Sequence, residues 1–242
     1  MDNYLTVAKI SATPNPQTII YAALHQDYCE DFVMYQKEKW PKTEKEAGEI
    51  AVKQLLKGGR GHFGCVEHPQ IVLNYGWFPH STMQQMRAHR IGVSFDVQSG
   101  RYTSQRIIDV STGKREIEEV FYLRPLGNYT DRKGHKYEYT EKQRNEDLQI
   151  CLKASHHYKE RIDQGFSEEQ ARGLIPFDVR QHWVMSANAR SLMHLLDLRW
   201  KANAQLECQW LCELTWPHFE EWVPEIAEWY LDNRAKKAKL AP

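Results

Sequence analysis

The stretch that organises this chain is residues 84–102, QQMRAHRIGVSFDVQSGRY. It holds three arginines, one histidine, two serines and two glycines. Pro79 and Ser81 form a helix start just before it, and Met83, Met86 and the arginines follow at helical spacing. We therefore expect a short helix over residues 81–90.

Beyond Gly92, apolar and polar residues interleave without a sustained period, so we expect a loop that faces a ligand. Fixed arginines beside serine hydroxyls and glycine amides suit a phosphate or another anion, because guanidinium makes paired, charge-assisted hydrogen bonds that lysine cannot make. The alternative interpretation is a solvated, salt-bridged helix end, since runs of charge are usually solvent faces.

The composition excludes some classes of function. Lys and Arg total 32, as do Asp and Glu, and this zero net charge argues against a nucleic-acid binder with a broad cationic surface. The five cysteines are an odd number and no secretory leader is readable, so we expect reduced thiols in the cytoplasm. No apolar run approaches the roughly 20 residues that cross a bilayer, so we expect no membrane segment.

The rest of the chain predicts a mixture of helices and strands. Helices are expected at residues 15–27, from Thr43 to Gly58-Gly59, at 140–164, from Ser167 to Arg172, and from Asn188 onward. The C-terminal helices are expected to be interrupted at Pro217 and Pro224. Strands are expected at 71–78, 120–125 and 174–187, a turn-rich connection at 61–69, and a loop or hairpin at 127–136, whereas 103–113 carries no clear signal.

The helix that begins after Asn188 has an unusual design. Its apolar stripe, Leu192, Leu195 and Leu196, continues into Arg199. An arginine on a core face needs an anion or carboxylate partner, because an unpaired buried charge is very costly. A second, polar stripe carries Arg190, His194 and Asp197, and its spacing leaves ligand binding and a structural ion pair equally open.

The first stretch resembles the signature of flavin-dependent thymidylate synthases, Arg-His-Arg-x-x-Ser-x-Asn-x-x-Ser-x-Arg. The matching residues are His89, Arg90, Ser94, Ser99, Arg101 and Tyr102, with Asp96 in place of the asparagine. Ala88 stands where the first arginine belongs and Arg87 lies one place earlier. One extra residue separates Arg90 from Ser94.

A second block resembles the same family. The family's Asn-x-Arg-Ser-Leu, Leu-Arg and Ala-Gln-x-Glu segments are matched by Asn188 to Leu192, Leu198-Arg199 and Ala204 to Glu207. Arg172, just before a Leu-Ile-Pro, and the Glu67-His68 pair also match. The resemblance extends over roughly residues 60 to 210.

The resemblance implies an α/β (α+β) fold in a single domain, residues 1–242, with a central, mostly antiparallel sheet flanked by long helices. It implies subunits that assemble around shared active sites as a homotetramer, with Arg101 reaching from a neighbouring subunit. The implied reaction is reductive methylation of dUMP to dTMP, with methylenetetrahydrofolate as carbon donor, FAD as hydride carrier and NADPH as reductant. None of the five cysteines follows a proline, unlike the nucleophile of the cysteine-dependent thymidylate synthases.

The resemblance also assigns roles to residues. Arg199 is the expected catalytic residue, a fixed cation at the pyrimidine ring. The residues expected to bind dUMP are Gln85, Arg87, Gln98, Ser99, Gly100, Arg101, Arg172 and Arg199. Those expected to bind FAD are His68, His89, Arg90, Ser94, Asp96, Asn188, Arg190 and His194. No metal is expected, because Cys208 and Cys212 share a helix face without a second pair of ligands.

Three other hypotheses stay open. A related flavin- and folate-dependent enzyme would hydroxymethylate a pyrimidine nucleotide instead. A non-catalytic nucleotide-binding or anion-binding module would bind oligonucleotides in a salt-dependent way and no flavin. A helical interaction protein, built around the tryptophans of the C-terminal part, would bind neither flavin nor nucleotide.

Overall fold

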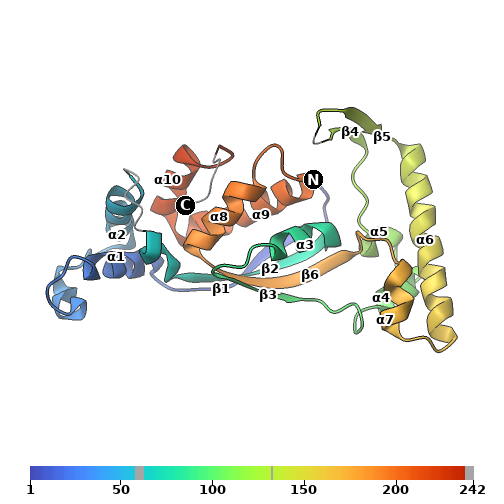
Figure 1. Ribbon diagram of the computed structural model, residues 1–242, viewed down its shortest axis with the longest axis horizontal. Helices are drawn as coiled ribbons and strands as arrows, with labels where there is room; N and C mark the ends of the chain where they lie inside the picture. The colour runs from blue at the N-terminus through green and yellow to red at the C-terminus, as the bar shows by residue number, and fades with distance from the viewer. Residues whose placement is uncertain (58–62, 132, 238–242) are drawn as a thin grey trace. The chain divides into compact units, whose positions relative to one another are not determined.

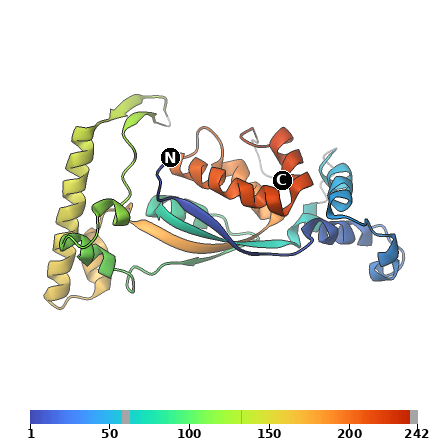
Figure 2. The same ribbon diagram turned by 180° about the vertical axis from the view of Figure 1, so that it is seen from behind.

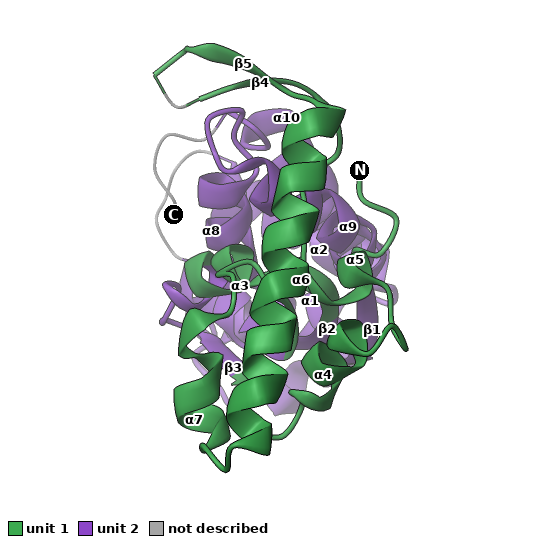
Figure 3. Cartoon of the chain, turned by 90° about the vertical axis from the view of Figure 1, so that its right-hand side faces the viewer, with its two compact units in different colours: residues 1–6, 75–85, 96–183 green, residues 7–74, 86–95, 184–242 purple. Residues whose placement is uncertain are grey.

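The computed structural model describes residues 1–57, 63–131 and 133–237 (Figure 1). The expected helix end at Gly58-Gly59 and the start of the turn-rich connection, Gly61-His62, lie outside these residues. The chain forms two compact units, each built from three separate segments (Figure 3). Unit 1 comprises residues 1–6, 75–85 and 96–183, and unit 2 comprises residues 7–74, 86–95 and 184–242. The single domain over residues 1–242 stays a prediction.

The main sheet has four strands in the order β1-β2-β6-β3. They are β1 (Thr6–Ala12), β2 (Gln70–Pro79), β6 (Arg180–Asn188) and β3 (Val93–Val97). The expected α/β class with an antiparallel sheet is confirmed. The boundary between the units falls inside β1, β2, β3 and β6, so all four strands contribute residues to both units.

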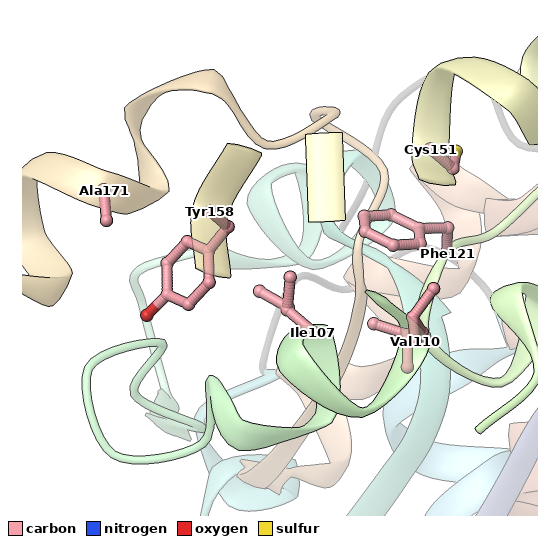
Figure 4. Close-up of a cluster of buried hydrophobic side chains, with 7 residues drawn as sticks. Ile107, Val110, Phe121, Cys151, Tyr158 and Ala171 are labelled. Carbon is pink, nitrogen blue, oxygen red and sulfur yellow. The ribbon is translucent and has the colours of Figure 1, made fainter. Parts of the chain in front are cut away.

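Unit 1 is a helical layer with its own core. Its elements are α4 (Gln105–Ser111), α5 (Ile117–Val120), the antiparallel hairpin of β4 (Gly127–Thr130) and β5 (Lys136–Tyr139), α6 (Glu141–Asp163), α7 (Glu168–Ala171) and the 3-10 turn η4 (Arg172–Leu174). The long helix α6 and the helix α4 lie side by side in both views (Figure 1, Figure 2). Apolar side chains close the space between them (Figure 4): Ile107, Val110, Phe121, Cys151, Tyr158 and Ala171.

Unit 2 carries the remaining helices. They are α1 (Pro16–Gln26), the 3-10 helix η1 (Val33–Lys39), α2 (Glu44–Ala51) with its wider last turn η2 (Val52–Leu56), the 3-10 helix η3 (Phe63–Glu67), α8 (Ala189–Arg199), α9 (Leu206–Trp222) and α10 (Pro224–Asn233). The buried amide of Gln17 ties three of them together, because its Nε2 donates to Glu44 O at 3.0 Å and to Glu225 Oε2 at 2.6 Å. Helix α3 (His80–Arg87) crosses the unit boundary.

Several predicted elements are confirmed by the structure. The helices at 15–27, 43–57 and 140–164, the strand at 71–78 and the hairpin around 127–136 all form. Ser167 caps α7 by accepting from Gln170 N at 3.4 Å. On α6, the side chains of Cys151, Ser155 and Tyr158 are buried.

Other predictions were wrong in detail. The segment after Gly92 was expected to be a loop, but Val93–Val97 is a strand whose odd residues are half-buried and whose even residues are exposed. Five alternating residues suffice, because a sheet edge orders a short period-2 segment. Residues 103–113, which lacked a signal, contain α4.

Two more corrections concern a strand and a proline. Residues 120–125 were expected to be a strand, but the helix α5 ends at Val120 and Phe121 forms only an isolated bridge with Val179. An apolar run that fills a core does not reveal its secondary structure. Pro217 was expected to interrupt the C-terminal helices, yet α9 runs through it to Trp222. Pro217 is exposed, so water can satisfy the carbonyl that loses its helical partner.

Over the described ranges, no helix combines the length and the apolar character needed to cross a membrane.

Candidate functional site

The predicted site residues divide between the two units. Unit 1 holds most of the residues expected to bind dUMP, namely Gln85, Gln98, Ser99, Gly100, Arg101 and Arg172, together with Asp96. Unit 2 holds Arg87 and Arg199 from the set expected to bind dUMP, and most of the residues expected to bind FAD, namely His68, His89, Arg90, Ser94, Asn188, Arg190 and His194. The partition by unit nearly follows the partition by expected ligand.

In unit 2, Arg199 and His89 form a direct contact. Arg199 Nε donates to His89 Nε2 at 3.1 Å, although the two residues are 110 positions apart. His89 is only 7% exposed, and its ring packs edge-on against His194 with 5.5 Å between ring centroids. One partner of Arg199 is thus a buried imidazole.

His89 meets Arg199 as a neutral ring. Burial, followed by the positive charge of Arg199 and the neighbouring His194, lowers the pKa of His89 to about 4. A neutral imidazole has one donor and one acceptor nitrogen, so Nε2 accepts from Arg199 and Nδ1 carries the proton. His89 therefore orients the guanidinium without cancelling its charge.

The start of α8 is fastened to the turn at Gly92. Asn188 caps α8, with its Oδ1 accepting from Ser191 N at 2.7 Å, and Asn188 N donates to Gly92 O at 3.1 Å. Ser191 Oγ donates to Ile91 O at 2.8 Å. Gly92 has a φ of +66°, and a side chain there would collide with Asn188 and Ser191. Glycine is needed here for both backbone conformation and space.

A small polar pocket opens on the same stretch of unit 2. It is lined by Arg87, His89, Arg90, Val93, Ser94 and Phe95 and measures about 240 Å³. This is below the roughly 300–1,000 Å³ typical of sites for drug-sized ligands, so the pocket can take one part of a larger ligand. Its arginine and serine donors match phosphate and carbonyl oxygens, which are the acceptor groups of FAD.

Arg190 lies beside this region on α8. Its Nη1 donates to Glu67 Oε1 at 2.6 Å, and its guanidinium lies over the Phe63 ring at 5.7 Å from the centroid. Both partners belong to η3. His68, next to Glu67, is exposed and makes no hydrogen bond or ion pair within the described residues.

Asp197, the acidic residue of the polar stripe on α8, has a structural role. Asp197 is 1% exposed, and its carboxylate accepts from Tyr230 Oη at 3.0 Å and from Arg234 Nη2 at 2.7 Å. Burial raises the pKa of Asp197, while hydrogen bonding and charge from Arg234 oppose the shift. For Asp197, the structure decides in favour of the ion pair over ligand binding.

In unit 1, residues 98–103 form a tight turn around the Ser99 carbonyl. Tyr102 N and Thr103 N donate to Ser99 O at 3.1 and 3.2 Å, and Thr103 Oγ1 donates to it at 2.9 Å. A Cβ on Gly100 would meet Arg172 Nη1 at 3.7 Å, so Arg172 lies against this turn. The turn and Arg172 together form the compact part of the expected dUMP site.

Arg101 at this turn has an easily replaced partner. Its Nη1 lies 2.9 Å from Glu169 Oε1, and both side chains are about half exposed, at 48% and 57%. Exposed ion pairs of this kind contribute about 0–1 kcal/mol. A phosphate can displace Glu169 from Arg101 at little cost.

Gln98, Gln85 and Asp96 are placed differently. Gln98 N donates to His182 O at 2.9 Å, so Gln98 extends the sheet before the turn begins. Gln85 is half-buried on α3, and Asp96 is an exposed residue of β3.

Sequence reasoning missed two residues that the structure singles out. Arg106 on α4 is 9% exposed, and two of its guanidinium nitrogens, Nε and Nη1, are buried without a hydrogen-bond partner in the described structure. Arg234 completes the pair with Asp197. Neither lies in a motif, and residues 103–113 carry no pattern, so no sequence signal pointed to them. In the resolved ranges, no cluster of three His, Cys, Asp or Glu side chains has the geometry of a metal site.

A family model described as "Thymidylate synthase complementing protein" matches residues 10–225. A protein named flavin-dependent thymidylate synthase from Haloarcula marismortui is 30% identical over 98% of this chain and 100% of its own length. One of the same name from Halobacterium salinarum is 32% identical, again over 98% of this chain and 100% of its own.

Solved structures share the fold. Thymidylate synthase X from Helicobacter pylori, solved with FAD and dUMP, superposes with a TM-score of 0.69 at 20% identity, covering 93% of this chain and 99% of the other. The UMP/dUMP methylase PolB from Streptomyces cacaoi, bound with 5-Br UMP, gives a TM-score of 0.71 at 18% identity, covering 98% and 96%.

Proposed function

Because the chain belongs to the thymidylate synthase complementing protein family, we propose that it is a flavin-dependent thymidylate synthase. It methylates dUMP to dTMP and uses FAD as hydride carrier. Methylenetetrahydrofolate supplies the carbon, and NADPH is the reductant.

One structural observation supports this function most directly. His89 comes from the first motif and Arg199 from the second, and they meet through a hydrogen bond of 3.1 Å. Two blocks that match the family in sequence therefore also meet in space. A solvated helix end or a plain anion-binding patch requires no such convergence.

Arg199 acts on the uracil ring. Negative charge develops on a ring carbonyl as the nucleotide is activated, and a fixed cation in a partly buried position stabilises it. Because Nε is held by His89, the plane of the guanidinium is set before the nucleotide binds. The chain needs no nucleophilic cysteine for this role.

FAD is held mainly by donors of unit 2. We assign Arg90 and Ser94 in the pocket, with Arg190 and His194 on α8, to the flavin nucleotide, and His68, His89, Asp96 and Asn188 to its surroundings. When bound, FAD supplies the hydride transfer, and the protein supplies orientation and charge. Asn188 acts mainly through the α8 start that it caps.

The nucleotide is held by the turn at residues 98–103. Ser99, Gly100 and Arg101, with Arg172 against the turn, bind the phosphate, and Gln85, Arg87 and Gln98 complete the set. Arg101 exchanges Glu169 for the phosphate. Such a turn suits an anion because the guanidinium groups of Arg101 and Arg172 can each make charge-assisted hydrogen bonds to it.

The working form is a homotetramer in the cytoplasm whose active sites are shared between subunits, and nucleic acid is not a ligand. Zero formal net charge supports the last point.

The test is reconstitution with FAD, desalting, and a visible spectrum, followed by NADPH oxidation with and without dUMP. Retained flavin and oxidation that depends on dUMP and methylenetetrahydrofolate are expected, with dTMP as the product by mass spectrometry. A hydroxymethylated product would show that the enzyme hydroxymethylates the nucleotide and does not methylate it. Absence of both bound flavin and turnover would contradict the proposal. Arg199→Ala should lose about 10²–10³-fold in kcat while keeping the flavin.

A further inference from the structure

His89 is the residue whose environment is least explained by flavin binding alone. It is buried, its ring stacks edge-on with His194, and its Nε2 is engaged by Arg199 Nε at 3.1 Å. The ring nitrogen of His89 that faces Arg199, Nε2, is therefore already occupied by a hydrogen bond within the protein. A role limited to flavin contact leaves this hydrogen bond without a purpose.

The charges around His89 hold its ring neutral. The groups that act on it electrostatically are Arg199 and His194, both on α8, and the pocket that it lines adds Arg87 and Arg90. This set contains cations and a histidine but no carboxylate. Burial and positive neighbours both oppose protonation, so the pKa falls to about 4 and the acceptor lone pair on Nε2 persists at neutral pH.

We propose that His89 is a positioning residue for the reaction: its neutral ring accepts the Arg199 Nε hydrogen bond and fixes the plane in which the guanidinium meets the uracil. The inference rests on the proposed function, because it takes Arg199 as the residue that activates the nucleotide. An imidazole suits this task better than a carboxylate. A carboxylate would orient Arg199 equally well but would cancel the charge that stabilises the reacting ring.

This role requires a hydrogen-bond acceptor at the position that His89 Nε2 now occupies. Glutamine places its amide oxygen near that position, whereas phenylalanine keeps the ring volume and removes the acceptor. His89→Gln should therefore retain kcat within about tenfold, and His89→Phe should lose about 10²-fold, the scale of a misplaced catalytic group. The KM for dUMP should change little in either variant, because the phosphate is bound in unit 1.

A matched control is His218, a half-buried histidine of the same unit whose Nε2 lies 3.1 Å from Val7 O. His218→Gln and His218→Phe test the same substitutions away from the site. Flavin retention is measured on every variant, so that loss of flavin is separated from loss of orientation.

The experiment has a readout besides activity. In ¹⁵N-labelled protein at pH 7, the His89 ring should show the neutral tautomer with the proton on Nδ1, with and without FAD. A protonated ring, or a proton on Nε2, would overturn the proposal. Equal losses of kcat in His89→Gln and His89→Phe would also overturn it, because the acceptor would then not matter. If the parent protein lacks dUMP-dependent turnover, the proposed function fails, whereas the tautomer still reports on the His89–Arg199 contact.

Discussion

Asp197 Oδ2 lies 2.7 Å from Arg234 Nη2, and this buried pair joins α8 to the chain that follows α10. Tyr230 adds a second hydrogen bond to the same carboxylate at 3.0 Å. Because Asp197 lies two residues before Arg199, the contacts that fix the end of α8 also fix the helix that carries Arg199, the proposed catalytic residue. The buried ion pair and the proposed catalytic residue are therefore close neighbours on one helix.

Asp197→Asn should lower the free energy of unfolding by about 2–3 kcal/mol, because removing one partner of a buried pair leaves the other uncompensated. The figure is below the usual range because the Arg234 side chain is 21% exposed. Urea unfolding of the flavin-free protein measures it. Glu213→Gln, which removes an exposed partner 3.9 Å from Lys236, should stay within about 0.5 kcal/mol. Equal stability of the two variants would show that the Asp197 pair contributes nothing.

Stability should fall as the pH drops from about 6.5 to about 4. The pKa of His89 is lowered from 6.5 to about 4 in the folded chain. Between these pH values the His89 ring is protonated in the unfolded chain but neutral in the folded chain. The loss from His89 is on the order of 3 kcal/mol and is absent above the window. His182, whose pKa is lowered by burial and by Arg106, adds a loss of the same sign.

Denaturant unfolding at a series of pH values checks this dependence. His89→Gln should show a shallower decline than the parent protein, and His218→Gln should keep the parent slope. A His89→Gln profile that superimposes on the parent profile would mean that His89 titrates normally in the folded state.

Arg190→Ala should weaken FAD retention by about 10–100-fold, the scale of one charge-assisted hydrogen bond. Glu67→Gln removes the present partner of Arg190 but leaves the guanidinium in place, so its effect should be under tenfold. Equilibrium dialysis of FAD measures both. The expectation fails if Glu67→Gln is the more damaging change, because Arg190 would then serve to hold η3.

Arg106→Met should stabilise the protein by about 1–2 kcal/mol in the absence of ligands. Its guanidinium is buried with two unpartnered nitrogens in the described structure, and burial together with the positive charge of Arg115 lowers its pKa to about 10. A buried charge without a partner costs more than an apolar side chain of similar volume. Thermal unfolding with Arg115→Met as control measures the change, and a destabilised Arg106→Met protein would mean that an acceptor satisfies Arg106 in solution.

The sequence predicted the strongest features of the fold because they follow long, regular patterns. The 23-residue helix α6 and the ten-residue strand β2 both have lengths over which a periodicity is unmistakable. Residues 93–97 alternate for only five positions, too few to separate a strand from a loop without knowing that a sheet edge receives them. Gly58-Gly59 lies outside the described residues.

The site shows the same limit in chemical terms. The stripe Leu192, Leu195, Leu196 and Arg199 predicted that the arginine needs a partner, but not that the partner is His89, because a neutral acceptor leaves no charge pattern in the sequence. The spacing of Arg190, His194 and Asp197 could not tell binding from structure, since the deciding residues, Glu67 and Arg234, lie on other elements. The division of the site residues between two units is likewise a property of the tertiary structure.

Each compact unit is assembled from three chain segments, and this has a consequence for biosynthesis. Unit 2 includes the stretch from residue 7 to residue 74 and also residues beyond 183, so a ribosome-bound chain lacks part of unit 2 until these later residues have been synthesised. Domains in tandem commonly fold one after another from the N-terminus during synthesis, but neither unit of this chain is a continuous segment that could fold first in this way. No single cut in the gene yields either unit intact, and split or truncated versions should be recovered only by co-expression of complementary fragments.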